Sequence, residues 1–385
     1  MATELYDAIV LGGGPAGSTA AMVLAGAGLS TVVLERAAFP RFHIGESLLP
    51  GMMRILRELG IAERIAAVPQ VEKLGATFVN GDGRDQLSFY FRDALKARQG
   101  ADSVAFNVER APFDTALLAA ARDAGAEVRR ADARAILRLA DGDVALEVEA
   151  GGERETLCGR FLVDASGQAA VVGRHLGLRR VHPDLKKVAY LGQFENVVRD
   201  PGPPGGFPVI AMCREGWFWL IPLDERRTSV GLVIDAGVAR RVGVPADRML
   251  DWGIARSPFL AERTAGAVKL ATAGVIADFS YRCEPFAGPG YFLAGDAATF
   301  VDPIFSTGVC LGMATGVEAA RSVTRLIRGE ERPAAARRRY ARLVDRTTAP
   351  FFRLVRLYYD PAFRDLFLEG SGPFPSRKRS RKAGS

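Results

Sequence analysis

The sequence predicts an α/β protein with an inserted, mainly antiparallel β-sheet and C-terminal helices. Residues 6–36, YDAIVLGGGPAGSTAAMVLAGAGLSTVVLER, have the pattern of a strand, a glycine-rich turn, an alanine-rich helix and a second strand. Alternating strands separated by turn residues are predicted at 78–91 and across 188–237. After about residue 310 the hydrophobic pattern becomes helical. A Rossmann-like nucleotide-binding domain interrupted by an inserted sheet accounts for this order of elements.

The chain is long enough to bury a large core, and its charge is unevenly distributed. It has 385 residues, 48% of them hydrophobic, which predicts two or three domains. The net charge of +7 comes from 51 basic and 44 acidic residues, and much of the excess lies at 328–342 and 376–382. These stretches are typical of a solvated helix face and a disordered basic tail. No nucleic-acid-binding motif accompanies them, so we expect no nucleic-acid partner. The basic residues are compatible with docking of an acidic partner protein.

Several other classes of protein do not fit the sequence. The four cysteines are far apart and form no CxxC pair, which predicts reduced thiols. Metal-ligand spacing is absent from the sequence, so we expect no metal. Acidic Glu4 and Asp7 stand where a signal peptide needs positive charge, and no apolar run reaches about 18 residues. We therefore expect a cytoplasmic protein without a membrane partner.

The glycine-rich turn predicts a dinucleotide site. The first glycine of GxGxxG allows a tight turn, the second lets the backbone approach a pyrophosphate, and the third lets helix pack on strand. Glu35 ends the next strand, where a carboxylate accepts hydrogen bonds from a ribose. A merely flexible glycine loop would not explain Glu35. The residues of this segment assigned to the cofactor are Gly12, Gly14, Ala16, Gly17, Glu35 and Arg36.

A second motif, late in the chain, bears on which dinucleotide binds. YFLAGDAATFVDPIFSTGV, at 291–309, places Gly295 and Asp296 after a buried strand. It resembles the Gly-Asp motif of flavoproteins of the hydroxylase and glutathione-reductase superfamily, which implies that Asp296 holds the ribityl or phosphate part of FAD. By the same resemblance, Arg110 in NVERAPFD approaches the flavin. A second glycine-rich nucleotide loop is missing from the sequence, so we expect a separate flavin reductase to supply reduced FAD.

Three further motifs occur together in one enzyme family. They are FPRFHIGESLLP at 39–50, GWFWLIP at 216–222 and FVDPIFSTG at 300–308. With these motifs, the sequence resembles the flavin-dependent halogenases over nearly its whole length. The resemblance implies that reduced FAD and O2 form a flavin hydroperoxide, and that halide ion attacks it to give hypohalous acid. That acid then halogenates an aromatic substrate.

The two tryptophans of GWFWLIP have a specific role in this family. Because Trp217 and Trp219 are two residues apart, both side chains lie on one face of a strand. In the family, the paired indoles lie beside the flavin and exclude organic substrate while admitting halide. The alternative is an ordinary buried strand of the inserted sheet, since aromatic residues favour strands in any case.

The resemblance also assigns residues around the flavin and the halide. It places halide beside the backbone amides of Thr307 and Gly308, at the start of a helix, where N–H groups favour an anion. It assigns Pro303 and Gly308 to the turn over the flavin. Arg41 and Ser47, in the FHIGES stretch, are cofactor contacts by the same resemblance.

Lys73, in VEKLGATFVN, matches the lysine with which the family receives and orients hypohalous acid. An amine can hydrogen-bond this acid or be converted to a haloamine, and burial lowers the pKa of a lysine toward the reactive neutral form. Lys186 and Lys187 are the nearest rivals in the sequence, but a doubled lysine is typical of an exposed turn.

Phe305 and the C-terminal region narrow the range of substrates that we expect. Tryptophan halogenases have a glutamate directly before Ser-Thr-Gly, where this chain has Phe305, so we expect a phenol or a pyrrole. The short C-terminal region resembles the branch that acts on pyrrole held on an acyl or peptidyl carrier protein, and basic helices suit an acidic carrier. An FAD-dependent monooxygenase or reductase of the same fold is the main alternative. A non-catalytic flavin-binding partner is the second alternative.

The order of the motifs predicts a discontinuous FAD-binding domain. Its three stretches are 1–72, 106–180 and 276–330. The substrate-domain sheet takes 73–105 and 181–275, a helical segment takes 331–370, and a disordered basic tail takes 371–385.

Overall fold

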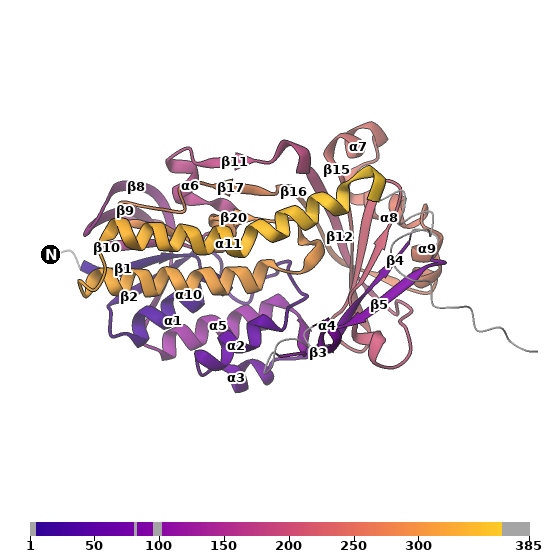
Figure 1. Cartoon of the computed structure of the whole chain (residues 1–385), viewed down its shortest axis with the longest axis horizontal. Helices are drawn as coiled ribbons and strands as arrows, with labels where there is room; N and C mark the ends of the chain where they lie inside the picture. The colour runs from indigo at the N-terminus through magenta and orange to yellow at the C-terminus, as the bar shows by residue number, and fades with distance from the viewer. Residues whose placement is uncertain (1–4, 81–82, 95–101, 364–385) are drawn as a thin grey trace, which may run out of the picture.

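The computed structural model describes residues 5–80, 83–94 and 102–363. A parallel sheet with its helices forms one end of the molecule, and a mainly antiparallel sheet forms the other (Figure 1). The predicted α/β class with an antiparallel sheet and C-terminal helices is therefore confirmed. The predicted disordered tail at 371–385 lies outside the described residues.

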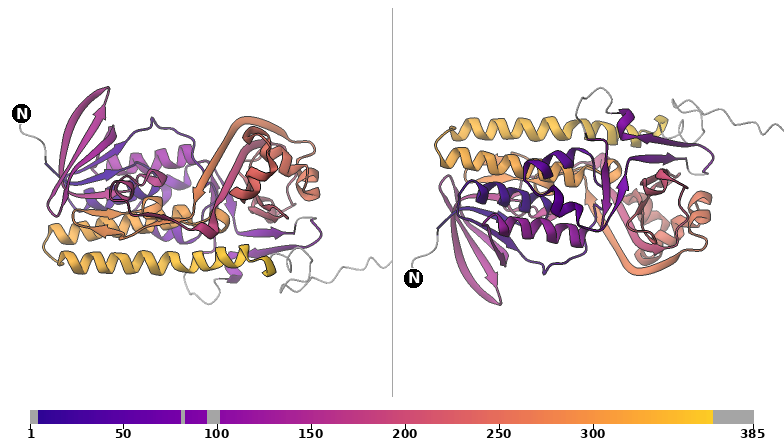
Figure 2. Two further views of the ribbon diagram at one scale, coloured as in Figure 1. Left: turned by 90° about the horizontal axis from the view of Figure 1, so that it is seen from above. Right: turned by 90° about the horizontal axis from the view of Figure 1, so that it is seen from below.

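The first sheet has the strand order β18-β19-β10-β1-β2-β7. Its central strands are parallel, and nearly every residue of β1 is buried, as expected for a strand covered on both faces. An antiparallel arm of β8 and β9 continues from β10 and projects at the end that carries the N terminus (Figure 2). The strands are β1 (Leu5–Leu11), β2 (Thr31–Glu35), β7 (Glu127–Arg130), β8 (Asp132–Ala140), β9 (Asp143–Ala150), β10 (Glu153–Asp164), β18 (Ala287–Gly288) and β19 (Tyr291–Leu293).

Helices cover this sheet through close contacts between small residues. Helix α1 (Pro15–Gly26) begins with proline at its first position and contacts both α5 (Arg110–Asp123) and α10 (Gly308–Ile327). Helices α10 and α11 (Pro333–Tyr359) run side by side (Figure 2). Helix α3 (Ala62–Ala66) contacts α5, and α2 (Gly51–Glu58) contacts α3 and α10 (Figure 1).

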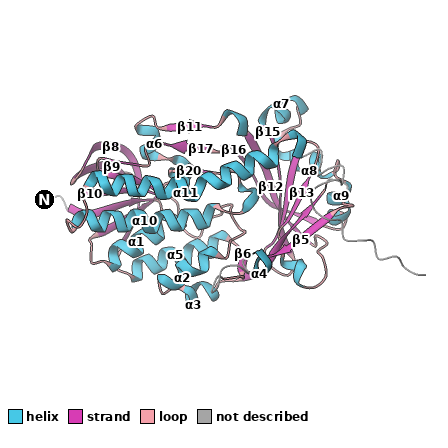
Figure 3. Cartoon of the chain, viewed as in Figure 1, coloured by secondary structure: helices cyan, strands magenta, loops and turns pink. Residues whose placement is uncertain are grey.

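The second sheet has the order β16-β12-β15-β14-β13-β4-β5 and lies away from the N terminus (Figure 3). Neighbouring strands are antiparallel except for β13 with β4. The strands are β4 (Gly75–Val79), β5 (Gln86–Tyr90), β12 (Lys187–Glu195), β13 (Val209–Met212), β14 (Gly216–Pro222), β15 (Arg227–Asp235) and β16 (Val268–Phe279).

The two faces of the second sheet bury different residues. On one face, Phe218 of β14 belongs to a core formed with α7 (Ala236–Val242), α8 (Met249–Ile254) and α9 (Pro258–Thr264). On the other face, Trp217 and Trp219 pack in a cluster with the end of α11. The alternation along β14 therefore directs both indoles away from the helices α7 to α9.

Shorter elements complete the fold. They are β3 (Gln70–Lys73), β6 (Ala105–Val108), β11 (Arg179–Val181), β17 (Tyr281–Cys283), β20 (Thr299–Phe300), α4 (Phe91–Ala94), α6 (Val171–His175), and the short 3-10 turns η1 (Gly167–Ala169), η2 (Pro183–Leu185), η3 (Pro203–Gly206), η4 (Ala246–Arg248), η5 (Gly295–Ala297) and η6 (Pro303–Phe305). Strand β3 pairs with β6, while β17 pairs with β11 and β20. The domain limits given above stay a prediction.

Within the described part of the chain, no helix combines the length and the apolar character needed to cross a bilayer.

Gly316→Ala should lower the thermal denaturation midpoint of the apoprotein. A Cβ added at Gly316 would lie 2.2 Å from Ala16 O, so α1 and α10 would have to separate. Overpacking of this kind costs about 1–3 kcal/mol. Gly26→Ala is the control, because a Cβ there meets nothing within 4 Å. Equal midpoints for the two variants would show that the helices are not in close contact at Gly316.

Candidate functional site

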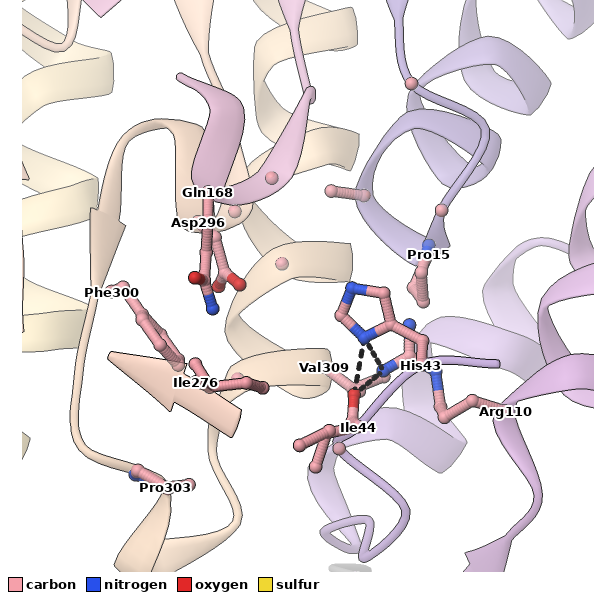
Figure 4. Close-up of a pocket in the computed structure, with 18 of the residues that line it drawn as sticks. Pro15, His43, Ile44, Arg110, Gln168, Ile276, Asp296, Phe300, Pro303 and Val309 are labelled. Carbon is pink, nitrogen blue, oxygen red and sulfur yellow. Dashed lines mark hydrogen bonds between the residues drawn. The ribbon is translucent and has the colours of Figure 1, made fainter. Parts of the chain in front are cut away.

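A cavity of about 650 Å³ is lined by residues of both sheets, within the usual size range of cofactor sites. Asp296 and Gln168 lie on one side of it, and Pro15, His43 and Arg110 lie on the other (Figure 4). Trp217 and Trp219 of the second sheet also line it. Of the predicted residues, it is further lined by Gly12, Gly14, Ala16, Glu35, Arg36, Arg41, Ser47, Pro303 and Gly308.

The glycine-rich turn has room only for glycine at two of its positions. Gly12 has φ +96°, and an added Cβ would lie 2.4 Å from Ala165 O. A Cβ at Gly17 would lie 1.8 Å from Gly12 O, which is the close packing of helix on turn expected for the third glycine. Gly17 supports the turn without lining the cavity.

Glu35 braces this turn. Its Oε2 accepts a hydrogen bond from Gly13 N at 2.8 Å, and its Oε1 accepts one from Ala37 N at 2.7 Å. A carboxylate oxygen has more than one lone pair, so both oxygens can accept a further bond from a ribose hydroxyl. The same carboxylate therefore shapes the turn and faces the cavity.

Two arginines and Asp114 form a charged group beside the turn. Arg110 binds Asp114 with Nε at 2.7 Å and Nη2 at 2.9 Å, and it also donates to Ile44 O. Arg41 Nη1 lies 3.4 Å from Asp114 Oδ2, yet it has no hydrogen-bond acceptor among the described residues. A guanidinium with one buried nitrogen that lacks an acceptor, beside a glycine-rich turn, fits the pyrophosphate of a dinucleotide.

Asp296 follows β19 at the same cavity. Gly295, at φ +59°, brings the backbone close to Ala16, since an added Cβ would lie 3.1 Å from the Ala16 side chain. Burial raises the pKa of Asp296 to about 6, against the charge of Arg110. Together with the glycine-rich turn, Glu35 and Arg41, this arrangement fits FAD.

Trp217 and Trp219 form one wall of the cavity. Their ring centroids are 5.9 Å apart at an interplanar angle of 52°, and their exposed fractions are 1% and 5%. Trp217 Nε1 donates to Tyr359 Oη at 2.7 Å, and Trp219 Nε1 donates to Ser229 Oγ at 3.2 Å. Both indoles are therefore held in a defined orientation by their N–H groups.

The turn at 302–308 leads into α10, and its apolar residues pack in the cluster that contains both tryptophans. Asp302 caps η6 by accepting from Ile304 N at 3.1 Å, and Ser306 has a left-handed φ of +56°. Thr307 is the N-cap residue of α10, and Gly308 is its first residue. Their backbone amides lie at the positive end of a 20-residue helix, where an anion is favoured.

Lys73 does not itself line the cavity, but its amine contacts Ser47, which does. Its side chain is 2% exposed, and Nζ donates to Ser47 Oγ at 2.8 Å and to Leu48 O at 2.7 Å. Ser306 Oγ donates to Ser47 Oγ at 3.2 Å, so one hydroxyl group connects the amine to the turn. Burial lowers the pKa of Lys73 to about 7, so the neutral amine is well populated at neutral pH.

The expectation that both Lys186 and Lys187 lie in an exposed turn is wrong for Lys187. Lys186 is exposed, whereas Lys187 begins β12, is 8% exposed and has its Nζ 4.1 Å from the ring centroid of Tyr359. Lys187 lies in the strand and is buried, whereas Lys186 precedes the strand and is exposed.

Sequence reasoning assigned no role to three residues that the structure brings to the site. Glu46 lines the cavity, and burial raises its pKa to about 7. Asp302 is fully buried beside the turn, and Tyr359 contacts Trp217 from the end of α11. The position of Glu46 inside the FHIGES motif could have identified it as a site residue. No sequence pattern marks Tyr359.

Gly231→Ala should displace the indole of Trp219. Gly231 pairs with Trp219 across β15 and β14, and an added Cβ would lie 2.1 Å from Trp219 Cζ2. We expect a changed tryptophan emission spectrum and a loss of about 1–3 kcal/mol of stability. Gly274→Ala, whose Cβ would make ordinary contacts at 3.5 Å, serves as the control. Emission unchanged in Gly231→Ala would contradict the position of this indole.

The chain is similar to known proteins over most of its length. A family model described as an FAD binding domain matches residues 5–341. The 1H-pyrrole-2-carbonyl-[peptidyl-carrier protein] brominase of Pseudoalteromonas luteoviolacea is 31% identical over 331 residues, which cover 85% of this chain and 79% of that protein. The corresponding chlorinase of Pseudomonas fluorescens is 29% identical over 379 residues, covering 93% of this chain and 84% of that protein.

A solved structure is similar over most of the fold. The myxobacterial chondrochloren halogenase has a TM-score of 0.86 and 34% identity, with 93% of this chain and 83% of that chain covered. The glycine-rich turn, the paired indoles and the turn before α10 stand in a fold shared with these enzymes. The chain therefore belongs to the flavin-dependent halogenases, and FAD is its cofactor.

Proposed function

We propose that this halogenase chlorinates or brominates an electron-rich aromatic ring, a phenol or a pyrrole. The observation that carries the proposal is the connection from Lys73 through Ser47 to Ser306, beside the paired indoles. A buried amine with a lowered pKa then stands one hydroxyl group away from the turn that would hold halide. Bound reduced FAD supplies, with O2, the two-electron oxidation of halide to hypohalous acid.

Different residues of the chain would bind halide, exclude the substrate from the flavin and hold hypohalous acid. The backbone amides of Thr307 and Gly308 would hold the halide ion at the N terminus of α10. Trp217 and Trp219 would exclude the aromatic substrate from the flavin side, so that halide rather than substrate meets the oxidant. Lys73 would hold hypohalous acid by a hydrogen bond or as a haloamine, since its neutral amine carries a free lone pair.

The apolar side chain of Phe305 supports an electron-rich substrate. It packs against the cluster that contains both tryptophans, at the position directly before Ser306. No carboxylate stands there to assist attack on a less reactive ring. A phenol or a pyrrole activates its own ring carbons and needs no such assistance.

A carrier-tethered pyrrole is the form of substrate that we favour. The two relatives described above are named for pyrrole-2-carbonyl groups on a peptidyl carrier protein. Helix α11 exposes Arg338, Arg342 and Arg346 at intervals of four residues, which makes one basic face suited to an acidic carrier. A separate flavin reductase completes the set of partners.

The test is mass spectrometry of products formed from three substrate sets. Phenols, free pyrroles and pyrroles on a carrier protein are incubated with the enzyme, FAD, a flavin reductase, NADH, O2 and chloride or bromide. A halide-dependent isotope pattern on the carrier-tethered pyrrole supports the proposal. Addition of oxygen without halogen would instead identify a monooxygenase of the same fold.

Lys73→Ala should abolish halogenation while leaving FAD binding and the oxidation of reduced FAD intact. The reason is that the substitution removes the amine but touches neither the glycine-rich turn nor the indoles. Product yield and FAD absorbance are measured together, with Lys186→Ala as the exposed-lysine control. Full halogenation by Lys73→Ala would remove Lys73 from the mechanism.

The free energy of unfolding should rise with pH above about 7 because of Lys73. Its pKa is lower in the folded chain than the value of about 10.4 of a solvated lysine. Between these values the unfolded chain binds a proton that the folded chain does not, which stabilises the fold as pH increases.

Urea denaturation at a series of pH values measures this effect. Lys73→Met should lose the rise between pH 7 and 9, and Lys186→Met should keep it. A Lys73→Met profile parallel to that of the wild type would mean that the folded amine stays charged.

A further inference from the structure

Three segments far apart in the sequence meet at one hydroxyl group. Trp217 Nε1 donates to Tyr359 Oη at 2.7 Å, and Tyr359 Oη donates to Asp302 Oδ2 at 2.8 Å. An indole N–H can only donate, so the tyrosine oxygen must accept from Trp217 and its own proton must point to Asp302. The donor and the acceptor of both hydrogen bonds are therefore fixed, from Trp217 to Tyr359 and from Tyr359 to Asp302.

Asp302 connects this chain to the turn before α10. While Oδ2 accepts from Tyr359, Oδ1 accepts from Ile304 N at 3.1 Å and caps the first turn of 303–305. The carboxyl group is fully buried, and burial raises its pKa to about 6, against the Tyr359 hydrogen bond. One buried side chain thus contacts both the turn and, through Tyr359, the wall.

Lys187 and the end of α11 hold Tyr359 in place. Lys187 Nζ lies 4.1 Å from the centroid of the Tyr359 ring and 3.5 Å from Asp235 Oδ2. Phe352 and Val355 of α11 pack in the cluster that contains both tryptophans. Helix α11 crosses from the first sheet toward the second (Figure 1), and its last residue, Tyr359, contacts Trp217.

We propose that Tyr359 is a positioning residue, which acts through Trp217 and Asp302 to hold the indole wall and the turn at 302–308 in one fixed arrangement. The C-terminal helix then contributes to the reaction site without touching the flavin. This inference rests on the proposed function, since it assumes that the wall separates substrate from oxidant. Loosening the wall would let oxidant escape before it reaches the substrate.

Tyr359→Phe removes the hydroxyl group and keeps the ring that packs on Lys187. Trp217 Nε1 then loses its acceptor, and Asp302 loses its donor. The neighbouring Tyr358→Phe is the matched control, because Tyr358 Oη is buried and has no hydrogen-bond partner in the described part of the chain. Asp302→Asn is a second variant, since an amide can accept from Tyr359 or from Ile304 N but not from both.

The first readout uses the apoprotein. The indole N–H vibration in ultraviolet resonance Raman spectra reports the hydrogen bond of Trp217. We expect this band to shift in Tyr359→Phe and in Asp302→Asn, and to stay unchanged in Tyr358→Phe. An unshifted band in Tyr359→Phe would overturn the proposal, because the hydrogen bond would then be absent.

The second readout is coupling, the amount of modified substrate formed per reduced FAD consumed. We expect Tyr359→Phe to bind FAD normally and to lose coupling about tenfold, as the loss of one buried acceptor predicts. Wild-type coupling in Tyr359→Phe would overturn the proposal even if the band shifts. The proposed halogenation and the positioning role of Tyr359 can fail separately. An oxygenated product from the wild-type enzyme would refute the halogenation. The Raman and coupling comparison between the variants would still decide the role of Tyr359.

Discussion

The removal of ionisable groups from water around one cavity is the constraint on which this site depends. Burial lowers the pKa of Lys73 to about 7 and raises that of Glu46 to about 7. It raises the pKa of Asp296 and of Asp302 to about 6. Desolvation disfavours the charged form in each case, so groups that can hold or release a proton near neutral pH lie in the cavity lining or close to it.

Close backbone packing makes this burial possible. Gly12 and Gly17 let α1 approach the first sheet, and Gly316 lets α10 approach α1. Gly231 leaves space on β15 for the indole of Trp219. A side chain at any of these positions would clash with neighbouring atoms. The positions of the glycines therefore determine how closely the elements around the cavity pack.

Hydrogen bonds then join the polar groups near the cavity into two sets. Lys73, Ser47 and Ser306 form one connected group, and Trp217, Tyr359 and Asp302 form another. The segment 302–308 belongs to both groups, because Asp302 lies at its start and Ser306 near its end. Under the proposed function, in which halide is oxidised in one place and the product is used in another, this segment would connect the two places.

The sequence by itself determined the features that rest on local geometry. The glycine pattern at 12–17 specifies a backbone that only glycine can adopt, and the spacing of Trp217 and Trp219 specifies one face of a strand. The α/β class and the family followed from such local patterns and their order. The tertiary structure alone decided that Tyr359, 142 residues away, contacts Trp217, and that Lys187 is buried while Lys186 is not. These outcomes depend on which distant elements pack together and on how far each side chain is removed from water, and no local pattern contains that information.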